Sequence, residues 1–181
     1  MQPDSHKPID WRVFLLFIPV AYVTYLFHEF GHWSVGEILG NRMVYSLNYV
    51  WPRDGHYLQQ SHDLFVSIGG PAFSVLQAAI ALLIIERFGA LQAYPLAFFP
   101  MFNRFFSVLL GGLSRQDEAR ISAILGTGPY LIAIFVLSIL LLIVIRCSYR
   151  LDIGPRMNAY CVTVSTVCQL LVIGTYELLK V

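Results

Sequence analysis

Five long apolar stretches constrain this sequence more than any other feature. They run approximately over residues 11–39, 64–85, 91–113, 129–145 and 157–179. A helix that crosses the hydrocarbon core of a bilayer needs about 20 residues. Within a bilayer, only helices and closed barrels satisfy every backbone polar group. The stretches therefore predict an all-α, multi-pass membrane protein with about five transmembrane helices.

The composition agrees with a membrane environment. Apolar residues of the AVILMFWYC set make up 57% of the 181 residues and charged residues only 13%, whereas soluble domains carry about 25% charged residues. A small water-soluble domain could not hide this much apolar surface, since small domains expose much of what they contain. The net charge of +1 offers no basic patch, which argues against a nucleic-acid partner. We expect one integral membrane domain over residues 1–181, with the lipid bilayer as its surroundings.

Two local features qualify this topology. Lysine and arginine divide almost evenly between the two expected sides of the membrane, so the positive-inside rule does not determine the orientation. Pro95, Pro100 and Arg104 lie within the third stretch, and they are expected to break or tilt its helix.

The segment between the first two stretches, residues 41–63, differs in kind. Residues 43–51 are rich in β-branched and aromatic side chains, residues 52–55 read Pro-Arg-Asp-Gly, and residues 56–58 resume an extended pattern. This order predicts a β-hairpin that turns at residues 52–55. An open sheet edge cannot face lipid, so the hairpin is expected at the membrane interface or in the wall of a protein cavity.

The pentapeptide His28-Glu29-Phe30-Gly31-His32 carries the clearest chemical signal. Residues four apart lie on one face of a helix, so both imidazoles can bind one Zn²⁺ while the glutamate takes a proton from a metal-bound water. A chance match is the alternative, but ionisable residues inside a membrane helix are costly and indicate function. We predict one zinc ion per chain, with His28 and His32 as ligands and Glu29 as the general base.

A catalytic zinc site needs a third protein ligand. His28 lies about 25 Å along the helix from Trp11, near the far side of the membrane, where residues 41–63 and the end of the third helix also emerge. Spacing along the chain does not decide which residue is the third ligand. For Asp117, the alternative to a ligand role is a capping role at a helix start, in the pattern Ser114-x-x-Asp117. The candidates are Asp54, His56, His62, Asp63 and Asp117.

These motifs resemble the site-2 protease family of intramembrane zinc metalloproteases. Residues 28–32 resemble its H-E-x-G-H helix, and Ser67-Ile68-Gly69-Gly70-Pro71-Ala72-Phe73-Ser74 is similar to the Gly-Pro motif that opens its next core helix. Asn103, with an acidic residue after it, resembles the family's last motif. The resemblance implies a three-helix core over about residues 11–125, with a hairpin between its first two helices. The helices over about residues 129–181 would be additions to that core.

The resemblance also implies a function. It points to a zinc endopeptidase that cleaves membrane-embedded segments of protein substrates, with Asp117 as the third ligand and Asn103 polarising the scissile carbonyl. It implies a bacterial-type cell membrane with the zinc site nearer the cytosol, and regulatory membrane proteins as possible partners. The chain departs from the family at residues 110–112, where no aspartate follows leucine, and at Ser74, where the family usually has asparagine.

Structural alternatives accompany these roles. Asn103 could be a buried amide bonded to a neighbouring helix, and Arg104 is better explained as an ion-paired or snorkelling residue than as an oxyanion stabiliser. Glycines 69, 70, 111 and 112 favour close helix packing. The functional alternative is a catalytically silent module, either a pseudoprotease or a metal-binding protein, that binds transmembrane helices.

Overall fold

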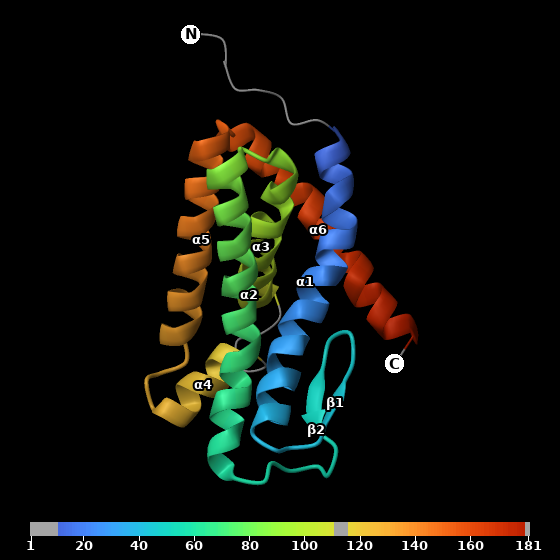
Figure 1. Cartoon of the computed structure of the whole chain (residues 1–181), viewed down its shortest axis with the longest axis vertical. Helices are drawn as coiled ribbons and strands as arrows, with labels where there is room; N and C mark the ends of the chain where they lie inside the picture. The colour runs from blue at the N-terminus through green and yellow to red at the C-terminus, as the bar shows by residue number, and fades with distance from the viewer. Residues whose placement is uncertain (1–10, 111–115, 180–181) are drawn as a thin grey trace.

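The computed structural model describes residues 11–110 and 116–179 (Figure 1). Five of the described helices are long and apolar enough to cross a membrane, which confirms the expected all-α, multi-pass fold with a small hairpin. In chain order the elements are α1 (Trp11–Ile38), β1 (Met43–Tyr45), β2 (Val50–Pro52), α2 (Gln60–Phe88), the 3-10 turn η1 (Leu91–Ala93), α3 (Tyr94–Leu110), α4 (Asp117–Leu125), α5 (Leu131–Leu151) and α6 (Pro155–Leu179).

The membrane-spanning helices pack around one aromatic core. Phe17 of α1 and Tyr94, Phe98 and Phe99 of α3 are almost completely buried there. Large apolar side chains also cover the outside of the bundle, for example Leu142 of α5. Helices that are apolar all round are suited to lipid as a solvent.

Helices α1 and α2 approach each other closely at two glycines. A Cβ atom added to Gly31 would lie 2.4 Å from the carbonyl oxygen of Gly69, and one added to Gly69 would lie 2.4 Å from that of Gly31. Small residues allow such backbone contact between membrane helices. The crossing places the second half of the 28–32 motif directly against α2.

Helix α3 is continuous over Tyr94–Leu110, so the expected break at its prolines is absent there. Pro95 stands in the first turn, where a missing backbone N–H costs little. Pro100 lies inside the helix and cannot donate to the carbonyl of Leu96, one turn earlier. The side-chain amide of Gln77 on α2 donates to that carbonyl instead, at 3.2 Å. The neighbouring helix thus satisfies the group that proline leaves unpaired.

The hairpin is present, but the expected position of its turn is wrong. Strands β1 and β2 are antiparallel, with Met43 opposite Pro52 and Tyr45 opposite Val50. The chain reverses at residues 46–49, where the backbone N–H and the hydroxyl of Ser46 both donate to the carbonyl of Tyr49, at 3.0 and 2.9 Å.

The Pro-Arg-Asp-Gly sequence forms a second turn that follows β2, and residues 56–58 are not a strand. The N–H of Gly55 donates to the carbonyl of Pro52 at 3.0 Å. Two hydrogen bonds hold the hairpin to α1: the Tyr45 hydroxyl donates to the Leu26 carbonyl, and the Met43 N–H donates to the Glu37 carboxylate. The hairpin and α4 lie at the same end of the bundle (Figure 1).

Candidate functional site

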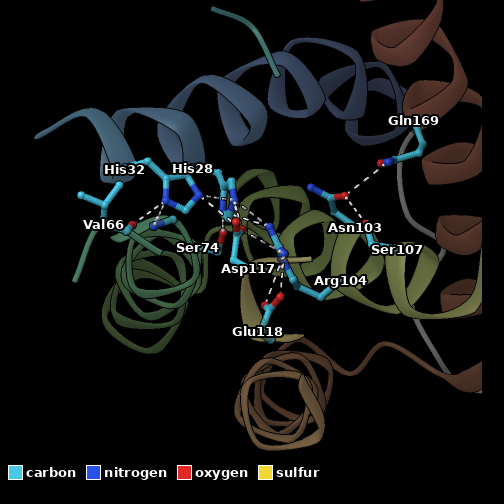
Figure 2. A network of polar contacts seen from close by, with 11 residues as sticks. His28, His32, Val66, Ser74, Asn103, Arg104, Ser107, Asp117, Glu118 and Gln169 are labelled. Atoms are coloured by element: carbon cyan, nitrogen blue, oxygen red, sulfur yellow. Dashed lines mark hydrogen bonds and ion pairs between the residues drawn. The ribbon is translucent and has the colours of Figure 1, made fainter. Parts of the chain in front are cut away.

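Three potential metal ligands meet on the inner side of α1 (Figure 2). The Nε2 atom of His28 lies 3.1 Å from Oδ2 of Asp117 and 3.2 Å from Nε2 of His32. The third edge, from Nε2 of His32 to Oδ2 of Asp117, is 3.3 Å. Tetrahedral zinc with bonds of about 2.0–2.1 Å sets neighbouring ligand atoms about 3.3 Å apart. This group could hold a metal ion, and its dimensions fit zinc.

The other nitrogen of each imidazole is held by a hydrogen bond. Nδ1 of His32 lies 2.6 Å from the carbonyl oxygen of Val66, and Nδ1 of His28 lies 3.0 Å from the hydroxyl of Ser74. Histidines that bind metals usually have such a partner on the second nitrogen. The carbonyl of Val66 only accepts, so this bond directs Nε2 of His32 toward the Asp117 carboxylate. In the neutral form of the ring, Nε2 can then bind a metal ion together with the carboxylate.

Gly70 of α2 forms the floor beneath the imidazoles. A Cβ atom added there would lie 2.2 Å from Nε2 of His32 and 2.6 Å from Nε2 of His28. Gly70 therefore permits close helix packing, as expected, and the atoms of α1 that it admits are those of the two imidazoles. The absence of a side chain here is a condition for the geometry of the site.

Asp117 is the one member of the group that does not lie on α1. It begins α4, and the side chain of its predecessor, the N-cap residue Gln116, makes no capping hydrogen bond. The alternative capping residue Ser114, and residues 111 and 112, lie outside the described residues. Burial would raise the pKa of Asp117, but the hydrogen bonds to His28 and His32 outweigh it and hold the pKa well below its usual range.

The alternative ligands between α1 and α2 do not approach the group. Asp54 and His56 are exposed, whereas His62 is buried elsewhere. Their contacts are those of His56 Nδ1 with the Asp54 carbonyl at 2.9 Å, of His62 Nδ1 with the Asn41 amide at 3.1 Å, and of the Asp63 carboxylate with Arg120 at 2.9 Å.

Glu29 lines a cavity of about 730 Å³ together with the three potential ligands. Its side chain is buried. Among the described residues, its carboxylate has no hydrogen-bond or ion-pair partner. A buried carboxylate without a partner beside a potential metal site is suited to proton transfer. The cavity is walled by α1, α2, α3 and α4, and by the turn of the hairpin at Asn48 and Tyr49.

Asn103 of α3 also lines this cavity. Its Oδ1 atom accepts a hydrogen bond from the Gln169 amide of α6 at 3.2 Å, and Gln169 also donates to the Tyr25 hydroxyl. The structural alternative stated for Asn103, a buried amide bonded to a neighbouring helix, is thus observed. In Figure 2 the amide nitrogen of Asn103 points away from Gln169. Sequence reasoning missed Gln169, although an amide inside an apolar helix was a signal for it.

Arg104 is ion-paired, as expected, and its partner Glu118 was missed. Nη1 of Arg104 lies 3.1 Å from Oε2 of Glu118, and Nη2 lies 2.9 Å from Nε2 of His28. With Glu29 and Asp117, three carboxyl groups and one guanidinium gather around the ligand triangle. An excess of acidic side chains in a buried site suits a bound cation. The donor set and this excess of acidic side chains therefore both fit a zinc ion.

Replacing Asp117 with alanine is expected to remove bound zinc from the purified protein. Loss of a charged ligand leaves two imidazoles, and the affinity should fall by about 100-fold or more. Elemental analysis of the zinc-to-protein ratio measures this. His56→Ala is the matched control, because His56 is exposed and is not a member of the group. An unchanged zinc content in Asp117→Ala would contradict the role of this residue.

Comparison of the chain with protein-family models, with curated proteins and with solved structures found no match. The functional interpretation therefore depends on the residues of the site and their geometry.

Proposed function

We propose that this protein is a zinc-dependent intramembrane endopeptidase that hydrolyses peptide bonds in membrane-embedded segments of other proteins. One observation carries the proposal. Two imidazole nitrogens and one carboxylate oxygen form a triangle with edges of 3.1–3.3 Å. Beside it, in a cavity between membrane-spanning helices, lies the carboxylate of Glu29, which has no partner within the part of the chain that the structure describes. The H-E-x-G-H pattern supports the same reading, because it resembles that of site-2 proteases.

The side chains around the triangle have distinct roles in this reaction. A bound zinc ion supplies Lewis acidity, which makes water more acidic and polarises a carbonyl oxygen. Glu29 accepts a proton from the attacking water while the oxygen of that water bonds to the carbonyl carbon. Glu29 then returns the proton to the amide nitrogen when the C–N bond breaks. Asn103 donates an N–H to the carbonyl oxygen, where negative charge develops.

The hairpin suits a substrate that must be unfolded locally. A transmembrane helix has its carbonyls hydrogen-bonded internally, so a scissile carbonyl becomes accessible only where the helix unwinds. Asn48, Tyr49 and Val50 line the same cavity as Glu29. A strand beside this cavity can bind an unwound segment through backbone hydrogen bonds, as in β-addition.

Removal and return of zinc test this proposal. The purified protein in detergent is incubated with tagged transmembrane segments that carry glycine and proline near one end, and the products are identified by mass spectrometry. We expect cleavage inside the apolar segment, loss of cleavage with a zinc chelator, and recovery on addition of one equivalent of zinc. Cleavage that persists without zinc, or a zinc-loaded protein that cleaves no such segment, would contradict the proposal.

A further inference from the structure

The short helix α4 must be held accurately if Asp117 is to reach the imidazoles. It has nine residues and is not among the helices long enough to cross the membrane. Besides the contacts of Asp117 itself, two ion pairs tie α4 to the membrane-spanning helices within the described residues. They join Glu118 to Arg104 of α3, and Arg120 to Asp63 of α2.

The two ion pairs differ in their surroundings. The side chains of Glu118 and Arg104 are 1% and 9% exposed, whereas those of Arg120 and Asp63 are 55% and 27% exposed. An exposed ion pair stabilises little. A buried pair has no water to replace a lost partner, so its geometry determines where both side chains lie. The pair of Arg104 and Glu118 is therefore the stronger restraint on α4.

Arg104 connects the two elements that supply the ligands. Nη1 lies 3.1 and 3.3 Å from the two carboxylate oxygens of Glu118. Nη2 lies 2.9 Å from Nε2 of His28, and Figure 2 shows the guanidinium between these residues. A guanidinium is planar and its donors are fixed relative to one another. It therefore holds Glu118, and with it the adjacent Asp117, at a set place relative to α3. The lone pair on Nε2 of His28 cannot both accept an N–H and bind zinc, so the ion pair with Glu118 is the restraint that persists when zinc is bound.

We propose that Arg104 and Glu118 are a positioning pair that places Asp117 against the imidazoles and thereby sets the affinity of the site for zinc. The inference rests on the proposed function, because it takes His28, His32 and Asp117 as the zinc ligands. It assigns a role to two residues that do not themselves contribute to the ligand triangle.

The test replaces both members of the pair with apolar side chains in the full-length protein, Arg104→Met with Glu118→Leu. Their charges cancel, so the double variant leaves the net charge of the ligand group unchanged. The dissociation constant for zinc is measured in detergent by competition with a chromogenic chelator. We expect zinc to bind at least about tenfold more weakly.

A double-mutant cycle distinguishes an effect that acts through the position of Asp117 from a general disturbance of the structure around the site. In an Asp117→Asn background, the apolar pair is expected to weaken zinc binding no further, because the ligand that it positions is already lost. The control is Arg120→Gln with Asp63→Asn, which removes the exposed ion pair of the same helix. Its zinc affinity should stay within about twofold of the original protein.

Each outcome decides the inference. Unchanged zinc affinity in the apolar double variant, or equal weakening with and without Asp117, would overturn the positioning role and leave the proposed function standing. Failure of the original protein to bind zinc would overturn the proposed function itself. If the apolar variant does not fold, as judged by circular dichroism, Arg104→Lys is measured in the same two backgrounds. Lysine keeps the positive charge, but its single ammonium group cannot reach both Glu118 and His28. Unchanged zinc affinity, or equal weakening with and without Asp117, would again overturn the positioning role.

Discussion

Gly70→Ala is expected to abolish zinc binding while leaving the helices formed. The added Cβ atom would lie 2.2 Å from Nε2 of His32 and 2.6 Å from Nε2 of His28, far inside van der Waals contact. The rings cannot retreat without breaking the hydrogen bonds of their Nδ1 atoms to Val66 and Ser74. Because both ligands move, we expect the zinc affinity to fall by about 100-fold or more.

The zinc-to-protein ratio after dialysis measures this effect, with circular dichroism as the check on helix content. Gly174→Ala on α6 is the matched control, since an added Cβ there meets nothing within 4 Å. We expect Gly174→Ala to retain one zinc ion per chain. A Gly70→Ala protein that also retains one zinc ion would show that the imidazoles do not use the geometry described here.

Glu29→Gln should remove peptidase activity and leave zinc in place. The amide keeps the size of the side chain but cannot accept the proton of the attacking water, and loss of a general base costs about 10²–10⁴ in rate. Glu29 is not a member of the ligand triangle, so zinc content should be unchanged. The rate of cleavage of the transmembrane segments and the zinc content are measured on the same preparations.

Glu37→Gln is the control on the same helix. The carboxylate of Glu37 accepts a hydrogen bond from the N–H of Met43 at 2.8 Å, and an amide oxygen can accept the same bond. We expect this variant to cleave at the original rate. Equal rates for Glu29→Gln and the original protein would exclude Glu29 as the base. Zinc binding by both without any cleavage would favour the alternative of a metal-binding module that binds transmembrane helices.

Features that depend on neighbours along the chain were predictable. Helix length follows from the thickness of the hydrocarbon core, so all five membrane spans were found. The prediction for the fourth was too short, because its helix ends at Leu151, six residues beyond the expected end at residue 145. The position of the hairpin turn was not predicted, because residues 43–51 favour strands throughout. The Pro-Arg-Asp-Gly sequence is also a stronger local turn signal than residues 46–49. The continuity of α3 at Pro100 was not predicted for a different reason. The carbonyl that Pro100 leaves without a donor accepts a hydrogen bond from Gln77, which lies on another helix.

The candidate site divides along the same line. The four-residue spacing of His28 and His32, with Glu29 between them, is a local property of one helix, and the sequence alone predicted that the two imidazoles lie together. The third corner comes from Asp117, 89 residues from His28 along the chain. Local rules left it among five candidates, and its role as a ligand stays a prediction.

Only the tertiary structure decided which acid approaches the imidazoles, that Gly70 leaves them room, and that Arg104 joins Glu118 to His28. The physical reason is that spacing along a helix orients side chains relative to their own axis, whereas packing between helices orients them relative to one another. A metal site with ligands from two elements needs both kinds of information. The spacing along one helix can be taken from the motif, whereas the relative orientation of two helices is known only from their packing.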